Sequence, residues 1–122
     1  EFEAEAEERW GDTDAYAQAA GRTARYGKAD WETIGAEAAD IYAKFGELLA
    51  EGVPPSDARA AAMVKSHRAH IGRWFYDCTP EIHAGLGQMF RADPRFAENI
   101  DKAGGEGAAA YLSAAIEATY GP

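Results

Sequence analysis

Hydrophobic positions in this chain recur at steps of three and four residues, the period of an amphipathic helix. The clearest run extends from Asp30, the expected cap, to about Glu51, where Gly52 and two prolines follow. Its apolar positions are Trp31, Ile34, Ala38, Ile41, Phe45 and Leu48. This spacing predicts one long helix with a single buried face.

Four further helices are predicted by their start signals and apolar stripes. Ser56 is expected to cap a helix running to about Arg73. Thr79-Pro80 and Asp93-Pro94 each place a capping side chain directly before a proline, which suits the first helical position. The last helix is expected from about Gly107 to Thr119. A weaker helix over residues 13–24 has mostly alanine as its apolar members, so it is marginal alone.

The whole pattern predicts an all-α fold of about five to six helices. Alanine is abundant, β-branched residues are scarce, and no segment shows sustained strand alternation. We expect a flexible N-terminal segment over residues 1–28 and a helical core over 29–122 within one domain. The acidic residues 1–9 suit a solvated tail that continues into a longer parent chain.

Charge and cysteine content narrow the function classes. A formal net charge of −9 argues against direct binding to nucleic acid or to an anionic membrane, because both require basic patches. The single cysteine excludes an internal disulfide and fits a reducing cytoplasm. No apolar run approaches the roughly 20 residues that span a bilayer.

The candidate chemistry gathers around the run Trp74-Phe75-Tyr76-Asp77-Cys78, at a helix junction. Such junctions often line pockets, although aromatic residues more often fill a core. Cys78 precedes a helix N-terminus, which favours thiolate, but a small structural cysteine is the simpler interpretation. Cys78 and His83 have no recognisable oxyanion site or orienting acid, so catalysis is not expected.

Metal binding is also weakly supported. His67, His70, Cys78 and His83 could form a zinc tetrad, but their spacings match no compact metal motif. His67 falls within an apolar stripe, which favours a hydrogen-bonded structural histidine. We therefore expect no metal and no cofactor.

Several ordered segments resemble a known family, the TipA-type thiopeptide-binding effector domain of MerR-family transcription regulators. The resemblance rests on Trp10-Gly11-Asp12-Thr13-Asp14-Ala15-Tyr16, Tyr26-x-Lys28-x-Asp30-Trp31, His67-Arg68-x-x-Ile71, Tyr76-Asp77-Cys78-x-x-Glu81-Ile82-His83-x-x-Leu86-Gly87-x-Met89-Phe90 and Asp93-x-Arg95-Phe96. It implies a globin-like domain whose cleft takes up apolar, often macrocyclic compounds. It further implies that the N-terminal part orders over the ligand, and that DNA is bound by a separate N-terminal helix-turn-helix domain in a homodimer.

One departure bears on mechanism. The founding type of this family attaches thiopeptides through a cysteine two residues after the histidine that matches His83, and that position is Gly85 here. Reversible binding is therefore expected unless Cys78 proves to be the reachable thiol. Two glycines within this helix, Gly85 and Gly87, also indicate a close approach by another helix or by a ligand.

Spacing and resemblance together predict the residues that line or close the cleft: Trp10, Tyr16, Trp31, His67, Ile71, Trp74, Tyr76, Cys78, His83, Gly85, Leu86 and Met89. The predicted function is ligand sensing for a transcriptional activator, without catalysis. The alternatives are a thiol- or metal-based stress sensor that uses Cys78 and the histidines, and, more weakly, a haem module suggested only by the globin-like shape.

Overall fold

The computed structural model describes residues 14–121, and this part of the chain is built from α-helices alone. In chain order they are α2 (Asp14–Thr23), α3 (Lys28–Ala50), α4 (Ala58–Trp74), α5 (Pro80–Ala92), α6 (Pro94–Gly104) and α7 (Ala108–Tyr120). The predicted all-α fold of five to six helices is confirmed. None of the described helices is long and apolar enough to cross a membrane.

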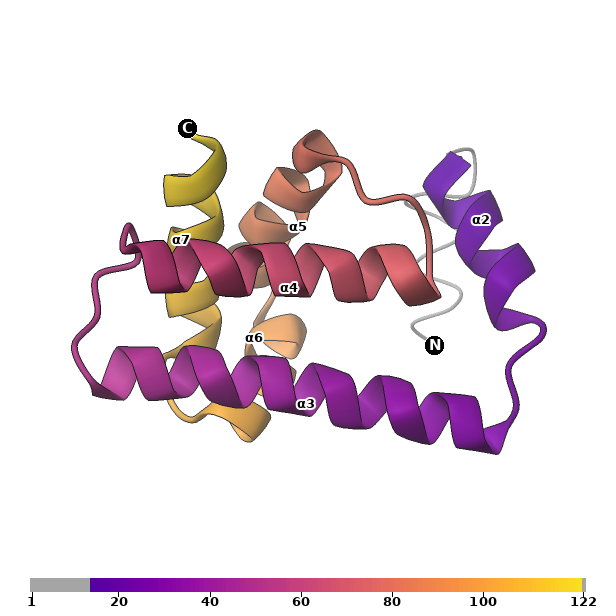
Figure 1. The fold of residues 1–122 in the computed structure, drawn as a ribbon, viewed down its shortest axis with the longest axis horizontal. Helices are drawn as coiled ribbons and strands as arrows, with labels where there is room; N and C mark the ends of the chain where they lie inside the picture. The colour runs from indigo at the N-terminus through magenta and orange to yellow at the C-terminus, as the bar shows by residue number, and fades with distance from the viewer. Residues whose placement is uncertain (1–13, 122) are drawn as a thin grey trace.

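The helices form two levels around one core (Figure 1). The long helices α3 and α4 run alongside one another in opposite directions, and α5, α6 and α7 lie behind them. The buried faces meet on α7, where Leu112 and Ile116 pack with Phe45 of α3 and Val64 of α4, all fully buried. The apolar stripe predicted for residues 30–51 buries Ile34, Ile41 and Phe45, whereas Trp31 at its start is 45% exposed.

Two of the predicted helix starts are confirmed in detail. The Thr79 hydroxyl accepts a hydrogen bond from the Ile82 amide at 3.2 Å, and Pro80 begins α5. The Asp93 carboxylate accepts one from the Arg95 amide at 3.0 Å at the start of α6. Both satisfy amides that the first turn leaves without an intrahelical partner.

Two other predicted caps are wrong by one to three residues. Asp57, not Ser56, caps α4, because its carboxylate accepts from the Arg59 amide at 2.8 Å. Gly27 is the N-cap of α3, and Asp30 lies inside the first turn and accepts from the Gly27 amide at 3.0 Å. In each case an aspartate satisfies an amide at the helix start, but from a different position.

Glycines allow two of the helix contacts in the core. A Cβ atom on Gly46 would lie 1.8 Å from the Gly104 carbonyl oxygen, so α3 and α6 touch through their backbones. A Cβ atom on Gly87 would lie 2.9 Å from the Ile116 side chain, so α5 approaches α7 closely. The predicted close approach at Gly87 is therefore made by a neighbouring helix.

Helix α2 is set apart from this core. It stands beyond the C-terminal end of α4, against which it packs (Figure 1). None of its ten residues is buried. The predicted helix over residues 13–24 is confirmed where the structure describes it, and its flexibility stays a prediction.

Candidate functional site

The connection between α4 and α5, residues 75–79, forms a corner around the single cysteine. Cys78 is buried, with 7% of its surface exposed, and its thiol lies 3.9 Å from the Thr79 carbonyl oxygen. Burial raises the pKa of the Cys78 thiol to about 11, and the positive charge of Arg68 offsets only part of that rise. The activated thiol considered from the sequence is contradicted, because burial outweighs the effect of the helix N-terminus.

A groove opens beside this corner, which we call the corner groove. It has a volume of about 550 Å³ and is lined by Lys65, Arg68, Ala69, Gly72, Asp77, Cys78 and Thr79. Its shape depends on Arg68, which donates from Nε to the Cys78 carbonyl oxygen at 2.6 Å and ties α4 to the connection. Small residues of α4 form part of its wall, and two cations stand along it.

An aromatic cluster, made of Tyr26, Trp31, Trp74 and Phe75, closes the same end of the molecule. Tyr26 meets both tryptophans edge to face, with centroids 5.7 Å from Trp31 and 5.6 Å from Trp74. Trp31 remains 45% exposed, an unusual position for so large an apolar side chain. The aromatic run at 74–76 is half-buried rather than a core plug, so it retains surface that could contact a ligand.

Glu37 fixes the orientation of Trp74. Its carboxylate accepts from Trp74 Nε1 at 2.8 Å and from His70 Nδ1 at 3.0 Å. These two hydrogen bonds, with the charge of Arg73 adding to them, lower the pKa of the Glu37 carboxyl. The indole is thus held by a charged acceptor at the edge of the aromatic cluster.

Two histidines predicted for the site lie in the core instead and bind each other. His67 Nδ1 and His83 Nε2 are 2.7 Å apart, and His83 Nδ1 is 2.8 Å from the Tyr120 hydroxyl. His67 is 2% exposed and His83 is fully buried. Burial lowers the pKa of His67 to about 3 and that of His83 to about 4, so both rings are neutral at pH 7. The structural histidine predicted at position 67 is confirmed.

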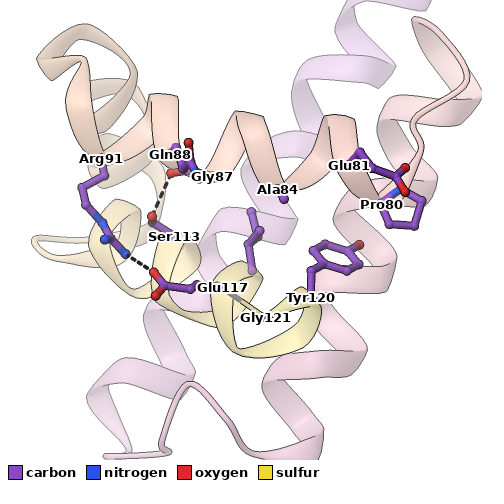
Figure 2. Close-up of a pocket in the computed structure, with 11 residues that line it drawn as sticks. Pro80, Glu81, Ala84, Gly87, Gln88, Arg91, Ser113, Glu117, Tyr120 and Gly121 are labelled. Atoms are coloured by element: carbon purple, nitrogen blue, oxygen red, sulfur yellow. Dashed lines mark hydrogen bonds and ion pairs between the residues drawn. The ribbon is translucent and has the colours of Figure 1, made fainter.

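A second hollow, which we call the α5–α7 groove, lies between α5 and α7 (Figure 2). Its volume is about 580 Å³, and its lining residues are Pro80, Glu81, Ala84, Gly87, Gln88, Arg91, Ser113, Ile116, Glu117, Tyr120 and Gly121. The Ser113 hydroxyl donates to the Gly87 carbonyl oxygen at 2.8 Å, and an Arg91–Glu117 ion pair of 3.2 Å bridges the two helices. None of the predicted site residues within 14–121 lines this groove.

The structure separates the predicted site residues into groups. At the corner end of the molecule, Tyr16 lies half-buried on α2, Trp31 and Trp74 belong to the aromatic cluster, and Tyr76 and Cys78 belong to the corner. The others lie elsewhere: Ile71, His67 and His83 are buried, Leu86 and Met89 pack on the core, and Gly85 is exposed. Trp10 is outside the described residues. Only Cys78 lines the corner groove. Within residues 14–121, no three His, Cys, Asp or Glu side chains are grouped to hold a metal ion.

Sequence reasoning missed the polar residues of this end of the molecule. Arg68 was visible only as part of a family motif, and its bond to the connection depends on the turn of the chain after α4. Arg22 and Gln18 carry no periodic or motif signal, yet they bind residues 50 or more positions away. Only the tertiary arrangement could have identified them.

The described part of the chain is thus an all-α domain with one groove at the corner between α4 and α5 and a second groove between α5 and α7. The chain belongs to the TipAS antibiotic-recognition domain family, whose model matches residues 2–119. It is 43% identical over 116 residues to the HTH-type transcriptional activator TipA of Streptomyces coelicolor, covering 95% of this chain and 46% of that protein. It is 42% identical over 95 residues to the activator mta of Bacillus subtilis, covering 78% of this chain and 36% of mta.

A solved structure supports the same relationship. TipAS of Streptomyces lividans in complex with nosiheptide superposes with a TM-score of 0.90 and 43% identity, over 98% of this chain and 82% of that one. This chain spans less than half the length of the transcriptional activators that it matches.

Proposed function

We propose that this domain senses apolar, macrocyclic antibiotics such as thiopeptides for a MerR-family transcriptional activator. The observation that carries the proposal is its 43% identity and TM-score of 0.90 to TipAS, which was solved with nosiheptide. Its 43% identity to the activator TipA supports the regulatory role. The activity proposed is binding, not catalysis.

The corner groove and the aromatic cluster are the proposed ligand surface. Trp31 and Trp74 would offer flat apolar area, and Tyr76 would extend that area toward Cys78. The remaining proposed contacts are Trp10, Tyr16, His67, Ile71, His83, Gly85, Leu86 and Met89. A hydrogen bond from His67 or His83 to a ligand would require the pair to rearrange, since each now binds the other.

Binding is proposed to be reversible and coupled to ordering of residues 1–28. Reversibility follows from the buried, protonated thiol of Cys78 and from Gly85, which has no nucleophile to offer. Coupled ordering reduces affinity but lets one segment adapt to chemically varied ligands. The unburied position of α2 suits such an element.

The wider assembly is proposed from the relatives. TipA is an HTH-type activator of which this chain matches 46%, so we propose that DNA is bound through a separate helix-turn-helix domain. A cytoplasmic homodimer is proposed from the family resemblance alone. The acidic charge of this domain, −9 in total, suits a sensor that does not itself contact DNA.

The test is an amide NMR titration of this domain with nosiheptide. We expect shifts concentrated in residues 10–31 and 74–89, with intact mass unchanged after the ligand is removed by denaturation. Shifts at Arg91, Ser113 and Glu117 of the α5–α7 groove, with none in residues 10–31 or 74–79, would contradict the proposed location. The absence of any shift at saturating nosiheptide would reject thiopeptide sensing by this domain.

A further inference from the structure

Helix α2 is fastened to the corner by side-chain hydrogen bonds. The Arg22 guanidinium donates from Nη1 to the Gly72 carbonyl oxygen at 2.7 Å and from Nη2 to the Asp77 carboxylate at 2.9 Å. The Gln18 side-chain oxygen accepts from the Asp77 amide at 2.8 Å and lies 3.4 Å from Arg22 Nη2. One helix therefore binds both the last turn of α4 and the connection that follows it.

The α2 region donates hydrogen bonds to backbone carbonyl groups at the C-terminal end of α4. The last four carbonyl groups of a helix have no intrahelical partner. Arg22 satisfies the Gly72 carbonyl, and the Tyr26 hydroxyl, just after α2, satisfies that of Trp74. A cation at this position also complements the negative end of the α4 dipole. The α2 region thus completes the C-terminus of α4.

The same residues belong to the corner groove. Gly72 and Asp77, the two partners of Arg22, both line it, next to Cys78 and Thr79. Any movement of α2 that breaks the Arg22 contacts frees the Asp77 side chain and leaves the Gly72 carbonyl without its donor. The Arg22 guanidinium therefore connects the seating of α2 to two residues that line the groove.

We propose that Arg22 is a positioning residue that couples the seating of α2 to the conformation of residues 75–79, and through them to ligand affinity. The affinity part rests on the function proposed above. By linkage, a ligand that prefers the seated state strengthens the seating, and loss of seating weakens the ligand by the same factor. Arg22 is suited to this role because its rigid planar fork spans two acceptors, a geometry that the compact ammonium of lysine matches less well.

The test compares Arg22→Gln with Arg25→Gln, a matched loss of charge three residues away. Arg25 is exposed, and its side chain makes no hydrogen bond or ion pair with any residue of the described region. Hydrogen exchange is measured without ligand. In R22Q we expect faster exchange of amides in α2 and at residues 75–77, including the Asp77 amide, while amides of α7 keep wild-type protection. R25Q is expected to match the wild type throughout.

Nosiheptide affinity, measured by calorimetry, is the second readout. We expect R22Q to bind about tenfold more weakly, the usual effect of losing a hydrogen bond to a charged group, and Arg22→Lys to be intermediate. Unchanged exchange at residues 75–77 in R22Q overturns the proposal, and so does wild-type affinity in a variant whose α2 exchanges fast. If the wild type itself fails to bind nosiheptide, the proposed function fails, and exchange alone decides the role of Arg22.

Discussion

The paired histidines link the stability of the domain to pH. Burial lowers the pKa of His67 to about 3 and of His83 to about 4, whereas an unfolded histidine titrates near 6.5. Between these values the unfolded chain binds more protons, so the free energy of unfolding falls as pH falls from 6.5 toward 4. From pH 7.5 to 5 we expect a loss of about 2 kcal/mol for each histidine. Urea denaturation at these pH values measures it.

A double variant separates the pair from other acid effects. Replacing both partners of a buried hydrogen bond by apolar residues of similar size can be nearly neutral. His67→Leu/His83→Leu should therefore lose most of the pH dependence in this window. An equally steep dependence in the double variant would show that other groups cause it.

The thiol of Cys78 should resist alkylation while the domain is folded. A pKa of about 11 instead of the ordinary 9.0 leaves about a hundredfold less thiolate, and burial adds a steric barrier. Mass spectrometry over time with iodoacetamide at pH 7.5 should show slow labelling that becomes fast in urea. Equal rates in the folded and unfolded protein would contradict a buried, protonated thiol.

Some individual residue roles could be predicted from the sequence, and others could not. The caps at Thr79 and Asp93 were predictable because the signal is local: a side chain, a proline and the next amides. The bond between His67 and His83 joins positions 16 apart on different helices, and nothing in the sequence specifies it. A buried histidine was predictable from its apolar stripe, but its partner was not.

At the scale of helices, alanine substitutions at two nearby glycines of α5 are predicted to have opposite effects on stability. Gly87→Ala would place a Cβ atom 2.9 Å from the buried, β-branched Ile116, which has little room to move. We expect it to destabilise the domain by about 1–3 kcal/mol, the usual effect of overpacking. Gly85→Ala meets nothing within 4 Å and should stabilise by about 0.5–1 kcal/mol, because alanine favours the helix.

Denaturation followed by circular dichroism compares the two variants under the same conditions. Because they differ only in position along one helix, a shared effect on helix propensity cancels. If Gly87→Ala were as stable as Gly85→Ala, the close approach of α5 to α7 would be wrong. The comparison therefore tests the contact between Gly87 and Ile116, two residues that line the α5–α7 groove.

The ends of the helices could not be predicted from the apolar pattern alone. The stripe over 30–51 predicted α3 well, yet the helix begins at Lys28, before the first apolar residue. The apolar stripe marks which part of a helix is buried, whereas the first turn is exposed and set by its cap. Helix α2 was predictable as a weak helix, but its seating through Arg22 depends on carbonyl groups of α4.

At the scale of the whole molecule, the two hollows predict different ligand positions, and the proposed site is the one at the corner. The fold class followed from composition and periodicity, because helical patterns are local and repeated. The hollows did not, because each is formed by residues from several helices or turns. Two neighbouring residues of α5 differ in their relation to the α5–α7 groove (Figure 2). Ala84 is half-buried and lines this groove, whereas Gly85 is exposed and does not line it.

A cysteine introduced at either position, in addition to the native Cys78, can locate the ligand. A thiol adds across the carbon–carbon double bond of a dehydroalanine, forming a C–S bond while its proton is transferred to the neighbouring carbon. Thiostrepton is a thiopeptide that contains dehydroalanine. We expect it to form a stable adduct on Gly85→Cys, because Gly85 is a proposed ligand contact and a side chain there has open space, and none on Ala84→Cys or on the wild type. Peptide mapping of intact adducts makes the measurement, and a small maleimide confirms that both new thiols are reactive. Adduct formation on Ala84→Cys alone would place the ligand in the α5–α7 groove and reject the proposed site at the corner.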